Sequence, residues 1–520
     1  MRERCRKVTL VLVTLVLMLP SCRDNANLPT TPKPLASIGT STAEEIVKFC
    51  SLCHAMPRPE SFAKDSWSME VSRGFEFYQK SGRSDVAVPN QQAVVEYFRS
   101  RAPEMSEFAP RPTESAELLP KELQSSRFRL DVTRRPEFIR HEKPSGISFV
   151  KELRINSDDG PSLLLSDMMN GGGHIWNPLK AGRSLTSWGT VAVSHPAGAC
   201  VCDLDGNGIQ DVIISDLGKF YPSDQKLGRV VWLRDVLAAT PKGDPIVLLK
   251  DVGRVSDVQA ADLDGDGDLD LAVAEFGWRA TGRVLWMQNN GPTESPKFTV
   301  HVIDPRHGAI HVPIVDLNKD GRLDVVVLLA QEHESVEVFL NQGAGKFEKE
   351  VLYAVGDPSF GSNGIQMVDL DHDGDDDVLY TNGDMFDSEV LKPYYGIQWL
   401  ENRGHYPFEV HHIAKLPGVH RALAGDIDND GDLDIVACAM WPSNLRDDGF
   451  KRGFDSVIWL EQTESFHFRR HVIEAGRCIH ASLELSDLNR DGRLDVVAGA
   501  IYERGDNSAQ AVSIWWNEPQ

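Results

Sequence analysis

The sequence predicts a mainly β protein whose larger part is a seven-bladed β-propeller, preceded by a small all-helical domain. Three observations lead to this prediction. A nine-residue acidic motif recurs six times between residues 203 and 495, at spacings of 59, 54, 53, 57 and 61 residues, the length of one four-stranded blade. An aromatic residue in a short strand-like segment recurs seven times between residues 176 and 515. Amphipathic helical segments lie ahead of these repeats.

Composition narrows the possible functions before any motif is considered. The chain has 520 residues, with 77 acidic against 54 basic side chains and a formal net charge of −23. A length of this size allows two to four domains with packed cores. Because a nucleic-acid binder needs a basic surface, no nucleic-acid partner is expected.

The first 22 residues read as an export signal. A basic start is followed by twelve uncharged, mostly aliphatic residues, 8–19, which as a helix are too short to cross a membrane. Residues 19–22 (LPSC) resemble a bacterial lipobox, which implies lipidation of Cys22 after cleavage; an ordinary cleaved signal is the alternative. We therefore expect an exported, periplasmic or cell-surface lipoprotein of a bacterium. It would meet the membrane only through its lipid, with residues 23–42 as a tether.

Residues 50–54 read C-S-L-C-H, the C-x-x-C-H spacing of c-type haem attachment. The thiols of Cys50 and Cys53 can add to the two vinyl groups of one haem, and His54 can reach the iron as an axial ligand. A zinc site would need more thiols or imidazoles, and residues 41–104 contain no other Cys or His. A redox dithiol without haem is the remaining alternative.

The surroundings of this motif fit a very small haem domain. Residues 42–45 cap a helix that runs into the motif, and residues 90–101 read as a second amphipathic helix. Residues 43–102 resemble the short c-type cytochrome domains that precede repeat domains in exported proteins of environmental bacteria. Our first choice for the sixth iron ligand is Met69, although a core role for it stays open. The other candidates are Met105, Met56 and an open iron position.

The six acidic motifs read D-x-[DN]-x-[DN]-G-x-x-D, each followed by an apolar run. Side-chain oxygens at positions one, three and five lie on one side of a tight loop, glycine at position six permits the turn, and position nine closes the shell. An EF-hand is excluded because it needs Glu at position twelve, where these motifs carry Ile214, Val273, Val327, Tyr380, Ala437 and Ala498. Up to six calcium ions are therefore expected between strand pairs, with plain acidic turns as the alternative.

The predicted calcium ligands occupy positions one, three, five and nine of each loop. They are Asp203, Asp205, Asn207 and Asp211; Asp262, Asp264, Asp266 and Asp270; Asp316, Asn318, Asp320 and Asp324; Asp369, Asp371, Asp373 and Asp377; Asp426, Asp428, Asp430 and Asp434; Asp487, Asn489, Asp491 and Asp495.

The blade count rests on the aromatic marker, which recurs at Trp176, Trp232, Trp286, Phe339, Trp399, Trp459 and Trp515. The first repeat lacks an acidic loop and is a degenerate blade. The last lacks an outer strand, which residues 127–132 are expected to supply, closing the ring.

Residues 103–126 carry four prolines and read as a linker. Residues 127–520 resemble the FG-GAP/VCBS repeat family, the seven-bladed calcium-loop propellers also seen in integrin α heads. The resemblance implies a mainly β, seven-bladed propeller with calcium-binding loops between the first two strands of six blades. With the small all-α c-type cytochrome domain ahead of it, this is the expected fold of the chain.

A ligand site is predicted at the end of the propeller opposite the calcium loops. Four of the six loop-bearing repeats present an imidazole six to nine residues before the first loop Asp. The predicted mouth residues are His195, His307, His311, His420, Arg421 and His480. They would bind an anion, a sugar or a metal; alternatively, they hydrogen-bond the connections between blades.

Three functions fit these features. The first is an electron-transfer lipoprotein whose propeller docks a redox partner protein or a polymer or sugar. The second is an oxidoreductase that passes electrons from a propeller site to its own haem, and the third is an adhesion or polysaccharide-binding module without catalysis. Motifs of hydrolases are absent from the sequence. Disulfide pairing among Cys200, Cys202, Cys438 and Cys478 is left open, although the first two read as small core residues.

Overall fold

The computed structural model describes residues 41–105, 127–131, 145–153, 160–180, 184–188, 193–236, 244–291, 295–386, 388–446, 453–464, 466–501 and 511–519. The predicted signal, Cys22, the tether and most of the predicted linker lie outside these residues. No helix in the described part is long and apolar enough to span a membrane.

The N-terminal module is all-helical. It contains α1 (Ala43–Cys50), α2 (Trp67–Lys80) and α3 (Gln91–Arg99), with 3-10 turns at Pro59–Ser61 and Lys64–Ser66. Thr42 and Glu45 form the expected capping box, and Asn90 caps α3 through the Ala93 N–H.

The core of this module is aromatic. The rings of Trp67 and Phe98 stack with centroids 4.0 Å apart, and Phe49 at the end of α1 packs on Phe75 of α2. These side chains form one buried cluster with Ile46 and Val94. The packing therefore fixes the end of α1, where the C-x-x-C-H motif begins.

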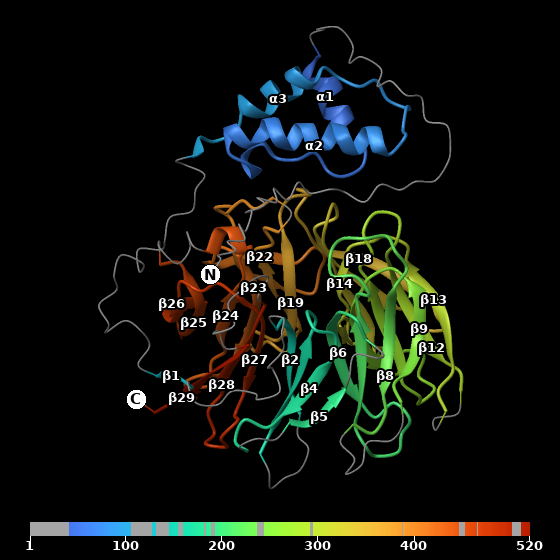
Figure 1. Cartoon of the computed structure of the whole chain (residues 1–520), viewed down its shortest axis with the longest axis vertical. Helices are drawn as coiled ribbons and strands as arrows, with labels where there is room; N and C mark the ends of the chain where they lie inside the picture. Colours follow the sequence, from blue (N-terminus) through green and yellow to red (C-terminus); the bar gives the residue numbers. More distant parts are fainter. Residues whose placement is uncertain are drawn as a thin grey trace, which may run out of the picture. The chain divides into compact units, whose positions relative to one another are not determined.

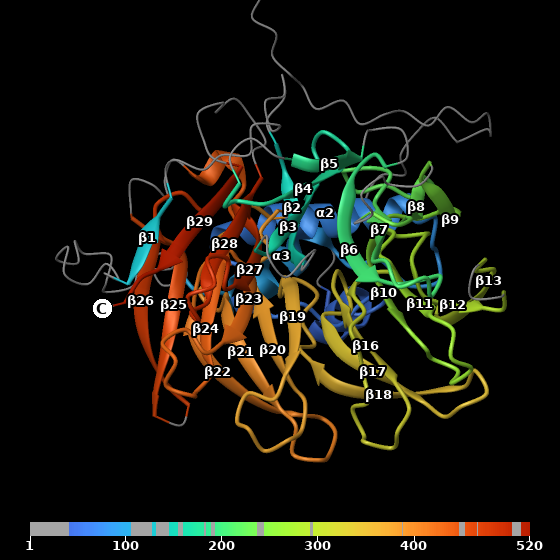
Figure 2. The same ribbon diagram turned by 90° about the horizontal axis from the view of Figure 1, so that it is seen from below.

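The described residues from 127 onward form seven antiparallel sheets, which Figure 1 shows from cyan to red and Figure 2 shows arranged around a common centre. Blades one to three are β2 (Ile147–Leu153), β3 (Ser162–Asp167), β4 (Gly173–Trp176), β5 (Ser184–Trp188); β6 (Pro196–Cys202), β7 (Asp211–Asp216), β8 (Gly228–Leu233), β9 (Ile246–Val252); and β10 (Val255–Ala261), β11 (Asp270–Glu275), β12 (Arg283–Asn289), β13 (Phe298–Asp304). Blades four and five are β14 (Ala309–His311), β15 (Ile314–Val315), β16 (Asp324–Leu329), β17 (Ser335–Asn341), β18 (Phe347–Ala354); and β19 (Ser362–Val368), β20 (Asp377–Asn382), β21 (Gly396–Glu401), β22 (Glu409–Lys415). Blades six and seven are β23 (Val419–Gly425), β24 (Asp434–Ala439), β25 (Asp455–Glu464), β26 (His467–Ala475); and β27 (His480–Ser486), β28 (Asp495–Ala500), β29 (Val512–Asn517), completed by β1 (Phe128–Leu130).

The ring closes as the sequence predicts. The early strand β1 pairs antiparallel with β29 in the last blade, with Arg129 opposite Trp516. The innermost strands of neighbouring blades contact one another all the way round, including β2 with β27. The seven-bladed prediction and the closing strand are therefore confirmed.

The hydrophobic core lies between adjacent blades. For example, Val326 and Val338 of the fourth blade pack against Ile365 and Tyr380 of the fifth. The second strand of every blade is buried along its whole length, which explains why the apolar runs directly follow the acidic loops. Each acidic loop joins the first and second strands, so all six lie at one end of the ring.

Candidate functional site

The C-x-x-C-H motif lies at the C-terminal end of α1. Cys50 is the last residue of the helix, and Cys53 and His54 follow in the turn after it. Both cysteines are free thiols; Cys50 is half-buried and Cys53 is exposed. Burial raises the pKa of the Cys50 thiol to about 11.

The residues around the motif suit a covalent haem. The Nδ1 atom of His54 lies 2.7 Å from the Ala55 carbonyl oxygen, a contact that leaves Nε2 as the nitrogen for an axial bond. Val47, one turn before Cys50, is an apolar side chain with 39% of its surface exposed, as expected of a residue that a macrocycle would cover. The donor set of two thiols and one imidazole is that of a c-type attachment site.

The structure separates the three candidate methionines. Met69, in the first turn of α2, is 53% exposed, and Met105 is 49% exposed. Met56 is half-buried and packs with Cys50 and Leu52 against the helical core. The ligation of the iron by Met69 stays a prediction.

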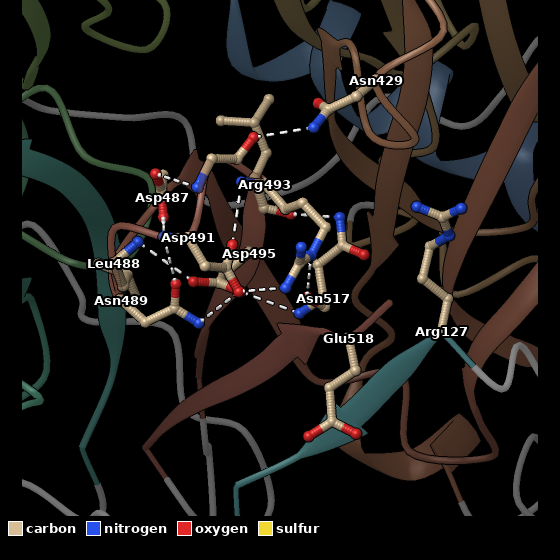
Figure 3. A network of polar contacts seen from close by, with 12 residues as sticks. Arg127, Asn429, Asp487, Leu488, Asn489, Asp491, Arg493, Asp495, Asn517 and Glu518 are labelled. Atoms are coloured by element: carbon tan, nitrogen blue, oxygen red, sulfur yellow. Dashed lines mark hydrogen bonds and ion pairs between the residues drawn. The ribbon is translucent and has the colours of Figure 1, made fainter. Parts of the chain in front are cut away.

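The first aspartate of each acidic loop holds the loop through backbone hydrogen bonds. Its two carboxylate oxygens accept the N–H groups of positions five and six at 2.7–3.2 Å in all six loops. Figure 3 shows this for the last loop, where Asp487 binds the N–H groups of Asp491 and Gly492. The glycine at position six has φ between +83° and +99°, as expected, and position four is also left-handed, with φ between +57° and +79°.

The ninth position has a structural role that the sequence did not reveal. One carboxylate oxygen accepts the N–H of position two at 3.0–3.2 Å, and the other accepts a backbone N–H at the end of the third strand at 2.7–2.9 Å. This aspartate is buried in every loop. It therefore ties the loop to its blade, and its role in closing an ion's shell stays a prediction.

The carboxylates of at least three loops lie close together. Three groups each bring one oxygen from three carboxylates within 4.8 Å of one another; they are Asp203, Asp205 and Asp211; Asp262, Asp264 and Asp266; and Asp369, Asp371 and Asp377. Burial, together with neighbouring carboxylates, raises the pKa of Asp434 and Asp495 to about 7 and that of Asp270 and Asp377 to about 6.

The six loops are not equivalent. Asp205 is paired with Arg234, Asp320 with Arg322, and Asp491 with Arg493, so these three loops carry a guanidinium against a predicted ligand. Asp428 in the fifth loop has a buried Oδ1 atom without a hydrogen-bond partner among the described residues, and so does Asp205 in the first loop, whose other oxygen meets Arg234. The fifth loop therefore offers an unsatisfied carboxylate oxygen of the kind that a hard cation binds.

Replacing the ninth-position aspartate should test its structural role separately from ion binding. The two carboxylate oxygens of Asp495 accept the N–H groups of Leu488 and Asn517. In Asp495→Asn, an NH₂ group takes the place of one of these oxygens, so one buried N–H donor loses its acceptor. This loss should lower the unfolding free energy by about 1–3 kcal/mol. Asp491→Asn changes a partly exposed side chain at position five. In the calcium-free protein, this variant should change the unfolding free energy by less than about 1 kcal/mol. Urea unfolding in EDTA measures both; equal losses would contradict the structural role.

Three predicted mouth residues lie together on the innermost strands. His311 ends β14, and its Nδ1 atom lies 3.6 Å from a carboxylate oxygen of Asp257 on β10. His420 and Arg421 belong to β23; burial first, and then the charges of His311 and Arg421, lower the pKa of His420 to about 4. Burial also lowers the pKa of Arg421, whose charge is balanced by Asp257 and Glu484.

The other three predicted mouth residues have different surroundings. The Nδ1 atom of His195 lies 2.7 Å from the Met168 carbonyl oxygen of the preceding blade, a blade-to-blade contact. His480 is fully buried and pairs with Glu474 at 2.8 Å. His307 contacts Glu332 in its own blade. The six residues therefore do not form one cluster.

Sequence reasoning missed residues whose signal was present. The strand segments used to count blades also carry Asn289, Asn341, Asn402 and Asn517, whose backbone N–H groups bind the ninth-position aspartates. The side chains of Asn341 and Asn517 also donate to carbonyl oxygens of a neighbouring blade. The signal for these residues was a polar residue that follows each aromatic marker by three places or fewer.

The family comparison gives one match. Residues 262–327 and 316–380 match the model of the FG-GAP-like repeat. This part of the chain is similar to FG-GAP repeats. The match spans the second, third and fourth acidic loops, so the FG-GAP repeat and the acidic loop coincide. No curated protein matches the chain in sequence.

Solved structures with a similar arrangement include two crystal structures of BBS1N in complex with ARL6DN. The one soaked with lead has 11% identity and a TM-score of 0.45, and covers 75% of this chain and 96% of its own. The one soaked with mercury has 11% identity and a TM-score of 0.42, with 72% and 92% covered. A nidogen/laminin complex has 10% identity and a TM-score of 0.32, with 51% and 80% covered.

Proposed function

We propose that this protein is an exported haem-c electron-transfer protein whose calcium-stabilised FG-GAP propeller is its docking domain. The observation that carries the proposal is the C-x-x-C-H motif at the end of α1, with two free thiols and an imidazole whose Nε2 is left for the iron. Bound there, a haem supplies reversible one-electron exchange. Export, with lipidation of Cys22, would place this chemistry in the periplasm or at the cell surface of a bacterium.

The chain's own residues have distinct tasks in this proposal. Cys50 and Cys53 hold the macrocycle covalently, and the Ala55 carbonyl orients the His54 ring. The aromatic core around Phe49 fixes the end of α1, so the ligands keep their positions when the iron changes charge. The exposure of Cys53 leaves one edge of the site open to a redox partner.

Calcium would bind the six acidic loops through carboxylate, amide and backbone oxygens. The oxygen-only donor sets and the unpartnered Asp428 oxygen support this assignment. Six Ca²⁺ ions would add twelve positive charges to a chain of net charge −23. The propeller would then dock a redox partner protein or a polymer or sugar.

An oxidoreductase is the second candidate function. It is favoured by the cluster of His311, His420 and Arg421 beside Asp257 on the innermost strands. These groups could bind an anionic substrate and move a proton, with the haem as electron acceptor. An adhesion module would need none of them.

A potentiometric titration of the full-length protein tests the proposed function. The absorbance of the haem should follow a reversible one-electron curve, and the reduced protein should be reoxidised by a small soluble acceptor. An Arg421→Gln/His420→Gln variant separates the two candidates, because it should leave the titration unchanged and remove only substrate-dependent reduction. A haem that is present but not reversibly reduced would reject electron transfer.

The proposed calcium sites predict a pH-dependent effect of chelation. Without the ion, Asp434 and Asp495 have folded pKa values of about 7, above the unfolded value of about 4. Their protonation therefore stabilises the fold at low pH, and this contribution is lost as the pH rises through about 7. Bound calcium removes the destabilisation that the ionised carboxylates cause at high pH. The difference in melting temperature between calcium and EDTA samples should widen from pH 5 to pH 8; a constant difference would contradict the prediction.

A further inference from the structure

Two connections of the fourth blade bring two imidazoles and a carboxylate together, away from the acidic loops. His307 lies between β13 and β14, and Glu332 and His333 lie in the turn between β16 and β17. The Ala330 N–H donates to the Gly308 carbonyl oxygen at 2.8 Å and holds the two connections side by side. Because the acidic loop joins the first two strands of the blade, this cluster lies at the other end of the propeller.

The potential ligand atoms converge. One atom of each residue lies within 4.8 Å of the other two, and the His307 Nε2 atom is 2.8 Å from a Glu332 oxygen. The ring centres of His307 and His333 are 5.4 Å apart. The His333 Nε2 atom is buried without a hydrogen-bond partner among the described residues. A buried, unpaired imidazole nitrogen is costly unless another group satisfies it.

The turn that carries Glu332 and His333 is held in an uncommon conformation. The flanking residues Gln331 and Glu334 have φ values of +59° and +43°, which cost energy outside glycine. Glu334 is buried and accepts the backbone N–H of Ser362 at 2.8 Å as well as its hydroxyl. At Gly308 a Cβ atom would lie 2.7 Å from the Ala330 carbonyl oxygen, so the facing connection also requires glycine.

The charge states suit metal ligation. Burial lowers the pKa of His333, which favours the neutral imidazole. Burial alone would raise the pKa of Glu332, but its contact with His307 outweighs burial and lowers the pKa, which keeps the carboxylate ionised. Neutral imidazole and ionised carboxylate are the ligand forms of these side chains.

We propose that His307, Glu332 and His333 form a binding site for a divalent first-row transition metal such as Zn²⁺, with one coordination position open. Two imidazoles and one carboxylate are a three-ligand set that zinc uses when it keeps a position for water or substrate. Imidazole nitrogen is not a ligand that calcium prefers, so this site is distinct from the acidic loops. The Glu332 side chain is 29% exposed, which leaves the open position accessible to solvent. The site does not depend on haem or on the function proposed above.

Zinc binding to the full-length, calcium-saturated protein tests the assignment. Isothermal titration with Zn²⁺ and elemental analysis after dialysis should give one tightly held zinc in the wild type. Glu332→Gln and His333→Ala should each weaken zinc binding by about 100-fold or more. Loss of a residue that only contacts a metal ligand already weakens binding by up to about 100-fold, and these residues are the ligands themselves. His471→Ala is the matched control, because His471 pairs with Glu461 at 2.6 Å without a second imidazole and should leave the zinc unchanged.

Thermal melting is a second measurement, which distinguishes a variant that has lost zinc binding from one that has not folded. Zinc should raise the melting temperature of the wild type and of His471→Ala, and should leave that of Glu332→Gln unchanged, while all three melt alike in calcium alone. Tight zinc that survives both site substitutions would place the ion elsewhere and overturn the proposal. Absence of tight zinc in a folded, calcium-loaded wild type would overturn it as well.

Discussion

Removal of calcium should lower the melting temperature of the propeller by on the order of 10 °C or more. In at least three loops, three carboxylate oxygens lie within 4.8 Å of one another, and the carboxylates repel one another when no cation is bound. An ion present at 100 times its dissociation constant adds about 2.7 kcal/mol at each site, so even a few occupied loops produce a large effect. Calorimetry of the full-length protein in millimolar calcium and in EDTA measures the shift.

The matched variant for this prediction is Asp371→Asn in the fourth loop. It removes one charge, and the retained amide oxygen can still accept the Asp373 N–H, which lies 3.2 Å from Asp371. The variant should therefore match or exceed the wild type in EDTA, because repulsion is relieved, and gain less from calcium. Equal melting temperatures with and without calcium, and no calcium in elemental analysis, would show that the loops are acidic turns held by their own hydrogen bonds.

Replacing Cys50 and Cys53 together by alanine should abolish covalent haem completely. No other residue pair in the helical module can form the two thioether bonds, since residues 41–104 contain only these two cysteines. Haem staining after denaturing electrophoresis and the mass of the intact protein measure the loss. The calcium-dependent melting of the propeller should stay, because its blades pack on one another through their own cores.

The control for this variant is Cys200→Ala/Cys202→Ala, which changes a second closely spaced pair of thiols. Cys200 and Cys202 lie on β6 and pack against the core between the second and third blades. Their replacement should leave the haem unchanged. Loss of the propeller transition in the Cys50/Cys53 variant would contradict the division of the chain into a haem module and a separate propeller.

The architecture followed from the sequence because each blade repeats its signals. The loop spacing gave the blade length, and the aromatic residues, from Trp176 to Trp515, all lie on third strands. The unpaired segment at residue 128 identified the closing strand because the last repeat lacked an outer one. These are local patterns, and repetition made them reliable.

The candidate sites were less accessible to sequence reasoning. His480 and His420 occupy similar places before their loops, yet one is paired with Glu474 in the core and the other lies beside Arg421. His307 and His333 lie close together because the turn before β17 contains residues with positive φ. None of the residue types in that turn predicts this conformation. Side-chain contacts between distant segments set these outcomes, and a repeat pattern carries no information about them.

The visible spectrum of the purified, dithionite-reduced protein tests the central claim most directly. A c-type haem held by Cys50, Cys53 and His54 should give a sharp α-band on reduction, and the colour should stay with the protein after extraction with acidified acetone. A protein without this band, or one that releases all its haem into the solvent, would contradict covalent haem and the electron-transfer function with it.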